Sequence, residues 1–166
     1  MEYIKIKERK DIFRLGIIDE YGKIVKDQNG EEVCLEFDLA DIELPLRYNR
    51  CINEINNAKR KLKNQFLIID KKQDHKGKQL LSKNEETKAR AIEEFYKEME
   101  QAMDLFLGQG GTRKYLNGRK PYWTMFEDLS EALKPYLPKM QLTVKDLENR
   151  IKDKYKVRER DVLTNE

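Results

Sequence analysis

The stretch at residues 84–137 constrains the fold most, because it contains two helical patterns separated by a cluster of glycines. Apolar residues in both patterns recur at steps of three and four, the spacing of one face of an α-helix. The patterns consist of Ile92, Phe95, Tyr96, Met99, Met103 and Phe106, then Tyr122, Trp123, Phe126, Leu129, Leu133, Tyr136 and Leu137. Gly108, Gly110 and Gly111 lie between them, and glycine tolerates the left-handed conformation in which helices commonly end. We therefore predict two helices joined by a sharp elbow.

The segment before this unit is predicted to form a small antiparallel β-meander and then a long helix. Three short strands rich in branched and aromatic residues are expected, at 12–18, 23–25 and 33–37. Asn29-Gly30 is typical of a tight hairpin turn. From 41 to 70, apolar residues keep to one helical seam, with Asp41 as a cap and Pro45 in the first turn. A seam this long needs a second helix against it, and the helix at 84–107 is the expected antiparallel partner.

The chain is thus expected to be a mainly helical α+β protein in three parts. Residues 1–40 form an N-terminal arm and the meander, 41–140 a helical domain with the elbow at 108–111, and 141–166 a charged C-terminal helix or tail. Pro135 and Pro138 are expected to close the helix that follows the elbow. Thr143 is the predicted cap of the final helix, on which Leu147, Ile151 and Tyr155 form a thin apolar edge.

Composition restricts the classes of partner. Charged residues make up 39% of the chain, against about 25% in ordinary domains, but 34 Lys and Arg face 31 Asp and Glu, for a net charge of +3. Such an even balance does not indicate a nucleic-acid or membrane partner. The sequence has no apolar run long enough to span a membrane and no apolar block of a signal peptide. With Cys34 and Cys51 read as free thiols, a reducing cytoplasm is the expected location.

No catalytic residue, metal site or cofactor is predicted. His75, the one histidine, lies in a charged loop, where a solvated role is more common than catalysis. Asp70, Asp74 and His75 have no recognised metal-ligand spacing. The glycines before Lys114 follow a helix, whereas a phosphate-binding loop follows a strand and opens a long helix. The elbow interpretation is therefore favoured over the phosphate-loop interpretation.

Two kinds of binding surface remain as hypotheses. Aromatic residues near the elbow and apolar residues of the final helix are candidate anchors for a protein partner: Tyr115, Tyr122, Trp123, Leu147, Ile151 and Tyr155. Two basic clusters are candidates for nucleic acid: Lys59, Arg60, Lys61 and Lys63 in the long helix, and Arg113, Lys114, Arg119 and Lys120 beyond the elbow. The near-neutral overall charge argues against backbone-driven nucleic-acid binding, which needs several unopposed cations.

Several phrases together resemble the tail assembly chaperones of long-tailed phages and prophages of Gram-positive bacteria. They are LEFDLADIELP at 35–45, the helix end MDLFLG at 103–108, the elbow GGTRKYL at 110–116, and LKPYL at 133–137. The resemblance covers about residues 33–137. It implies a non-enzymatic protein that binds the tape measure protein and helps bring major tail protein subunits to it. It also implies a protein of the bacterial cytoplasm that is absent from the mature virion.

The alternative hypothesis is a structural or regulatory nucleic-acid-binding protein of the same mobile element. Self-association also stays open, because the meander edge and the final helix each offer a surface for it. Salt-sensitive retention on DNA would favour the alternative, and a salt-tolerant complex with an apolar helical protein would favour the chaperone.

Overall fold

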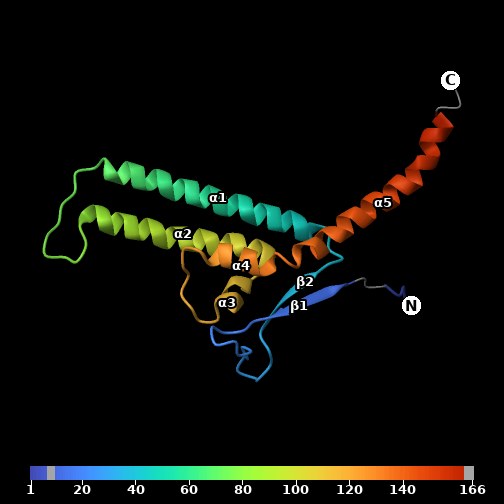
Figure 1. The fold of residues 1–166 in the computed structure, drawn as a ribbon, viewed down its shortest axis with the longest axis horizontal. Coiled ribbons are helices and arrows are strands. Elements are labelled where there is room, and N and C mark those ends of the chain that lie inside the picture. Colours follow the sequence, from blue (N-terminus) through green and yellow to red (C-terminus); the bar gives the residue numbers. More distant parts are fainter. Residues whose placement is uncertain (7–9, 163–166) are drawn as a thin grey trace.

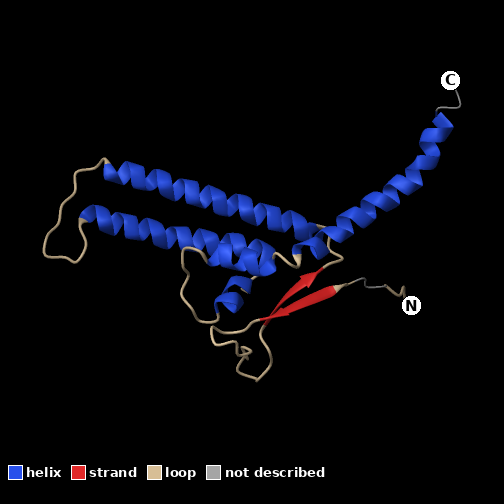
Figure 2. Ribbon diagram, in the orientation of Figure 1, coloured by secondary structure: helices blue, strands red, loops and turns tan. Residues whose placement is uncertain are grey.

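A helical hairpin forms the long axis of the molecule, and a small sheet and three further helices gather at one of its ends (Figures 1 and 2). The computed structural model describes residues 1–6 and 10–162, with side chains up to residue 155. Its elements, in chain order, are β1 (Ile12–Gly16), β2 (Cys34–Asp38), α1 (Glu43–Asp70), α2 (Lys83–Leu107), α3 (Gly111–Leu116), α4 (Met125–Leu133) and α5 (Leu137–Val162). The predicted mainly helical α+β class is confirmed.

The hairpin of α1 and α2 forms as the apolar seams predict. Asp41 lies just before α1, where its carboxylate accepts a hydrogen bond from the Glu43 N–H at 2.9 Å. Ser82 and Glu85 form the reciprocal bonds of a capping box at the start of α2. Ion pairs from Lys61 to Glu94 and Glu98 join the two helices along one side, consistent with their antiparallel course (Figure 1).

The core lies at the end of the hairpin where the sheet, α3 and α4 pack on it. Phe106 of α2 is its centre: its ring lies 5.2 Å from that of Phe37 in β2 and 5.0 Å from that of Tyr48 in α1. Leu129 and Leu133 of α4 are buried in the same cluster. Burial of aromatic rings from three elements fixes the sheet against the hairpin.

The sheet has two paired strands rather than three. β1 and β2 are antiparallel, with Leu15 opposite Leu35. The predicted middle strand, 23–25, forms only isolated bridges, Ile18 to Ile24 and Lys26 to Glu32. It is nevertheless tied to both neighbours: Ile17 donates to the Val33 carbonyl, Val33 to that of Val25, and Val25 to that of Ile17. These three backbone hydrogen bonds join residues 17, 25 and 33, while the sheet itself keeps two strands.

The segment after the elbow differs most from the prediction. A short helix, α3, follows the glycines directly, and Tyr122 and Trp123 lie in the loop before α4 instead of within a helix. α4 ends before Pro135, as expected, but Pro138 occupies the first turn of α5. Proline is tolerated there because a first-turn N–H has no partner within the helix.

The final helix begins earlier than predicted. α5 starts at Leu137, so Thr143 is not its cap and lies within it; the Thr143 hydroxyl donates a hydrogen bond to the carbonyl oxygen of Leu39. Tyr136, the residue just before α5, packs on the sheet, and its ring lies 5.2 Å from that of Phe13 in β1. Beyond these contacts α5 extends away from the rest of the molecule (Figure 1). Residues 163–166 of the expected tail lie outside the described residues.

Candidate protein-interaction surfaces

The glycine-rich elbow is closed by a carboxylate of the chain itself. Gly108 and Gly110 adopt φ angles of +87° and +74°, which turn the chain sharply between α2 and α3. Asp104 of α2 accepts hydrogen bonds from the N–H groups of Gly110 at 3.2 Å and Thr112 at 2.9 Å, and from the Thr112 hydroxyl at 2.6 Å. The amides that would face a bound phosphate are therefore already occupied by an internal anion. The elbow is a structural joint.

The residues considered for catalysis lie apart from one another. The His75 side chain is exposed in the loop between α1 and α2. Cys51 is fully buried in the core, and burial raises the pKa of its thiol to about 12, which keeps it protonated. Within residues 1–6 and 10–162, no three His, Cys, Asp or Glu residues lie where they would hold a metal ion.

Two of the predicted elbow anchors are fixed in place by their neighbours. Tyr115 and Tyr122 are half-buried against the core, and the guanidinium of Arg119 lies 5.7 Å and 6.0 Å from their ring centroids. Burial raises the pKa of the Tyr122 hydroxyl, and hydrogen bonds with Tyr115 and Asp128 raise it further. These contacts favour a packing role for Tyr115 and Tyr122 over a role as accessible anchors for a partner.

Trp123 is the elbow anchor that remains accessible. Its ring packs 5.2 Å from that of Phe95, yet 49% of the residue is exposed. It borders a groove between α1 and α2 of about 590 Å³, which we call the α1–α2 groove. The lining residues are Lys59, Leu62, Lys63, Phe66, Leu67, Ile92, Tyr96 and Trp123. Of these residues, the sequence predicted Trp123 as a protein anchor and Lys59 and Lys63 only as nucleic-acid candidates; the apolar walls were not predicted.

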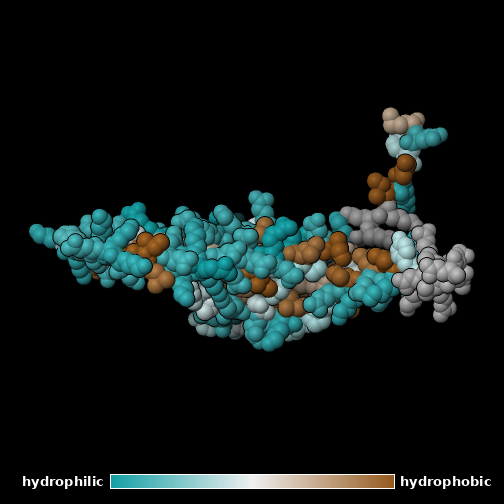
Figure 3. Space-filling view, turned by 90° about the horizontal axis from the view of Figure 1, so that it is seen from above, coloured by the Kyte–Doolittle hydropathy of each residue, from teal (hydrophilic) through white to brown (hydrophobic). Residues whose placement is uncertain are grey.

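The three anchors predicted on the final helix are all exposed. Val144, Leu147, Ile151 and Tyr155, here called the α5 stripe, are 41%, 41%, 55% and 50% exposed. Steps of three, four and four residues place them on one face of α5. Figure 3 shows hydrophobic atoms gathered toward the end of the molecule where α5 leaves, on a surface that is otherwise largely hydrophilic.

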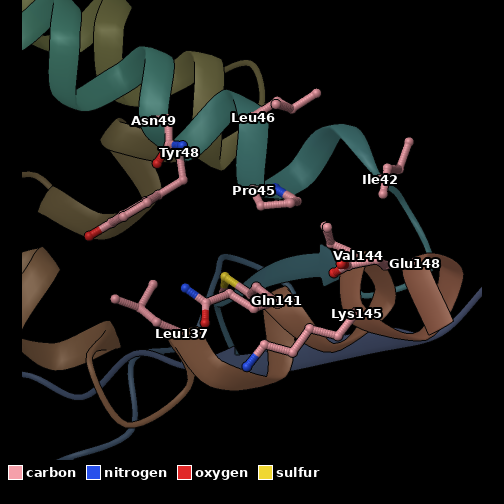
Figure 4. Close-up of a pocket in the computed structure, with 11 residues that line it drawn as sticks. Ile42, Pro45, Leu46, Tyr48, Asn49, Leu137, Gln141, Val144, Lys145 and Glu148 are labelled. Carbon is pink, nitrogen blue, oxygen red and sulfur yellow. The ribbon is translucent and has the colours of Figure 1, made fainter. Parts of the chain in front are cut away.

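A second groove continues the α5 stripe onto the hairpin. This α1–α5 groove has a volume of about 560 Å³ and lies between the first turns of the two helices (Figure 4). Ile42 and Leu46, both exposed, line the α1 side, and Val144 lines the α5 side. The sequence analysis overlooked Ile42 and Leu46. Their signal was present: both are apolar residues at the start of α1 that lie outside its buried seam.

The basic clusters proposed for nucleic acid are partly neutralised by the chain's own acids. Lys59 pairs with Glu127, Lys61 with Glu98, and Arg113 with Glu100 at 3.0 Å. Arg119 is held by the carbonyl oxygens of Leu116 and Tyr115. Five of the eight predicted cations are exposed and have no ion pair within the part of the chain that the structure describes: Arg60, Lys63, Lys114, Arg119 and Lys120.

Comparison with known protein families, curated proteins and solved structures gave no match. None of the described helices has the length and apolar character needed to cross a membrane.

Proposed function

We propose that this chain is a non-enzymatic tail assembly chaperone of a long-tailed phage or prophage, which binds the tape measure protein and helps recruit tail tube subunits to it. The observation that carries the proposal is the α5 stripe, an exposed apolar face on a helix that extends away from the core. An amphipathic helix of this kind suits a partner that is itself helical and apolar on one face.

The size of the α5 stripe limits the affinity that it can provide for the tape measure protein, which is the client in this proposal. From Val144 to Tyr155 it runs for about 16 Å at 1.5 Å per residue. Its side chains are already about half-buried, so covering each contributes on the order of 1 kcal/mol. A micromolar complex needs about 8 kcal/mol. The stripe alone therefore falls short of this, and contact with the exposed Ile42 and Leu46 in the α1–α5 groove would add about 2 kcal/mol.

The charged surface fits the same role. Glu148, Lys152 and their neighbours on α5 flank the apolar stripe, and Lys152 forms an ion pair with Glu148 one turn away. Charges of both signs around an apolar contact keep a loaded complex in solution without drawing it to nucleic acid. The ion pairs of Lys59, Lys61 and Arg113 give less support to the nucleic-acid alternative, which needs unopposed cations.

The proposal is tested by producing the tape measure protein with and without this chain. We expect the tape measure protein to stay in solution and to copurify with this chain at high salt, because the contact is apolar. Leu147→Glu should abolish copurification. Asn149→Glu is the matched control, since it adds the same charge on the opposite face of α5 and should leave copurification unchanged.

Two results would contradict the proposal. One is a Leu147→Glu chain that folds normally and still retains the tape measure protein as well as the wild type does. The other is retention of this chain on DNA that salt abolishes, together with no effect on the solubility of the tape measure protein; this result would favour the nucleic-acid alternative. The chain should also be missing from purified virions.

A further inference from the structure

The α1–α2 groove is a second apolar surface, separate from α5. Leu62, Lys63, Phe66 and Leu67 of α1 form one wall, Ile92 and Tyr96 of α2 form the other, and Trp123 closes one end. Leu67 is 53% exposed and Trp123 49%, so the apolar walls face solvent. Along α1 the lining runs from Lys59 to Leu67, about 12 Å or two helical turns. That length accommodates the apolar face of a short helical segment.

The charged residues that line this groove have one sign. Its two charged lining residues are Lys59 and Lys63. Lys59 stands at one end, 5.9 Å from the Trp123 ring, and Lys88 at the other, 5.5 Å from the Phe66 ring. The α1–α5 groove differs, because one lysine and one glutamate line it, Lys145 and Glu148.

The three lysines differ in how far the chain neutralises them. Lys59 pairs with Glu127, and Lys88 with Asp70. Lys63 has no ion pair among the residues that the structure describes, and it is exposed in the middle of the α1 wall. An occupant that brings a carboxylate beside Lys63 would gain a charge pair next to an apolar contact.

We propose that the α1–α2 groove binds an amphipathic helix whose apolar face fills the groove and whose flanks carry carboxylates. The inference rests on the proposed function because it assigns this helix to the tape measure protein. The apolar and acidic character of the helix is inferred from the residues of the groove alone. Apolar contacts supply the affinity, and the lysines select an acidic helix over a basic one.

Trp123 provides a direct probe, because it is the only tryptophan in the chain. The ligands are two synthetic helices of about 20 residues, free of tryptophan, with leucines at steps of three and four. One carries glutamates beside the leucines and the other carries lysines. Titrating the full chain with the acidic helix should shift the Trp123 emission to shorter wavelength, since the ring becomes covered. The basic helix should bind at least about tenfold more weakly.

Two charge-reversal variants locate the site. Lys63→Glu should weaken binding of the acidic helix by about tenfold or more and improve binding of the basic helix. Lys23→Glu, an exposed lysine of the segment between β1 and β2, makes the same change in net charge and should leave both affinities unaltered. Lys63→Gln serves as a milder variant if Lys63→Glu unfolds the chain, as judged by circular dichroism.

The inference is overturned if acidic and basic helices bind equally, if neither alters Trp123 emission, or if Lys23→Glu weakens binding as much as Lys63→Glu. Leu147→Glu on α5 should not change the titration. Failure of the proposed function would instead appear as loss of tape measure protein copurification, with the peptide titration still selective for the acidic helix.

Discussion

The Asp104 carboxylate accepts the Thr112 N–H at 2.9 Å and the Thr112 hydroxyl at 2.6 Å, so one residue of α2 caps the first turn of α3. Thr112 is fully buried and its hydroxyl also lies 3.3 Å from the carbonyl oxygen of Glu100. Hydrogen bonds between the partly buried Asp104 and the buried Thr112 hold the two helices at a fixed angle. The elbow is thus a rigid joint that positions the loop carrying Trp123.

Replacing Asp104 with alanine should destabilise the whole chain. The N–H of Thr112 and its hydroxyl would lose their acceptor in a buried site, which costs about 1–3 kcal/mol. The free energy of unfolding in urea measures this loss. Asp146→Ala, an exposed position on α5, is the control and should change stability by less than about 0.5 kcal/mol. Equal values for the two variants would mean that the Asp104 cap does not stabilise the elbow.

Gly111→Ala should also destabilise the chain, for a steric reason. A Cβ at Gly111 would overlap the Cβ of Leu107, which belongs to the last residue of α2 and cannot move independently. Relieving such an overlap costs about 1–3 kcal/mol. At Gly77 in the α1–α2 loop, an added Cβ meets no described atom within 4 Å, so Gly77→Ala should be neutral within about 0.5 kcal/mol. Comparing the thermal unfolding midpoints of the two variants separates the steric overlap at Gly111 from the general effect of replacing a glycine.

The two thiols should differ in reactivity. Cys51 is fully buried and the pKa of its thiol is raised to about 12, so almost no thiolate forms at about pH 8. Cys34 is only partly buried in β2. We expect a thiol reagent to modify Cys34 in the native chain and Cys51 only after denaturation, as read from masses of proteolytic fragments. Modification of Cys51 at the rate of Cys34 would show that the core opens readily.

Stability should fall in mild acid. Backbone N–H groups of Glu43, Asn84 and Ser82 lower the pKa values of Asp41, Asp74 and Glu85, respectively, below 3.8, 3.8 and 4.5. Above these ordinary values both folded and unfolded chains are ionised and the contribution is complete. Below them the unfolded chain takes up protons first, so folding weakens as pH falls from about 5 towards 3.

The urea midpoint measured across this pH range tests the acid effect. Glu85→Gln should reduce the dependence, because it removes one of the three titrating carboxyl groups. A midpoint that stays constant, or rises as the pH is lowered, would contradict the assignment.

The helical hairpin followed from the sequence because its signals are local and periodic. Ser82 and Glu85 stand three residues apart before an apolar seam, and that spacing by itself defines a capping box. The start of α5 could not be predicted from the sequence, because a proline such as Pro138 is found both after the end of a helix and in the first turn of the next one. The contacts of this region with Phe13 in β1 and with Leu39 favour the second position, and both partners are distant in sequence.

The two apolar surfaces also differ in how far the sequence predicted them. Leu147 and Ile151 were predictable as an apolar edge, because the charged residues around them left no other face for burial. The α1–α2 groove was not, since Phe66 and Ile92 belong to seams that a helical hairpin is expected to bury completely. Both residues line a groove because α3 and α4 cover the hairpin only at the end where the sheet packs. From the loop between α3 and α4, Trp123 alone contributes to the lining of the groove.

The proposed function assigns binding of the tape measure protein to the exposed apolar surface of α5. Amide hydrogen exchange of the full chain, alone and in complex with the tape measure protein, tests it most directly. We expect backbone amides around Leu147 and Ile151 to exchange more slowly in the complex, and those of the Asp104 elbow to be unchanged. Protection that appears only at the elbow, with α5 exchanging at the same rate in both samples, would contradict it.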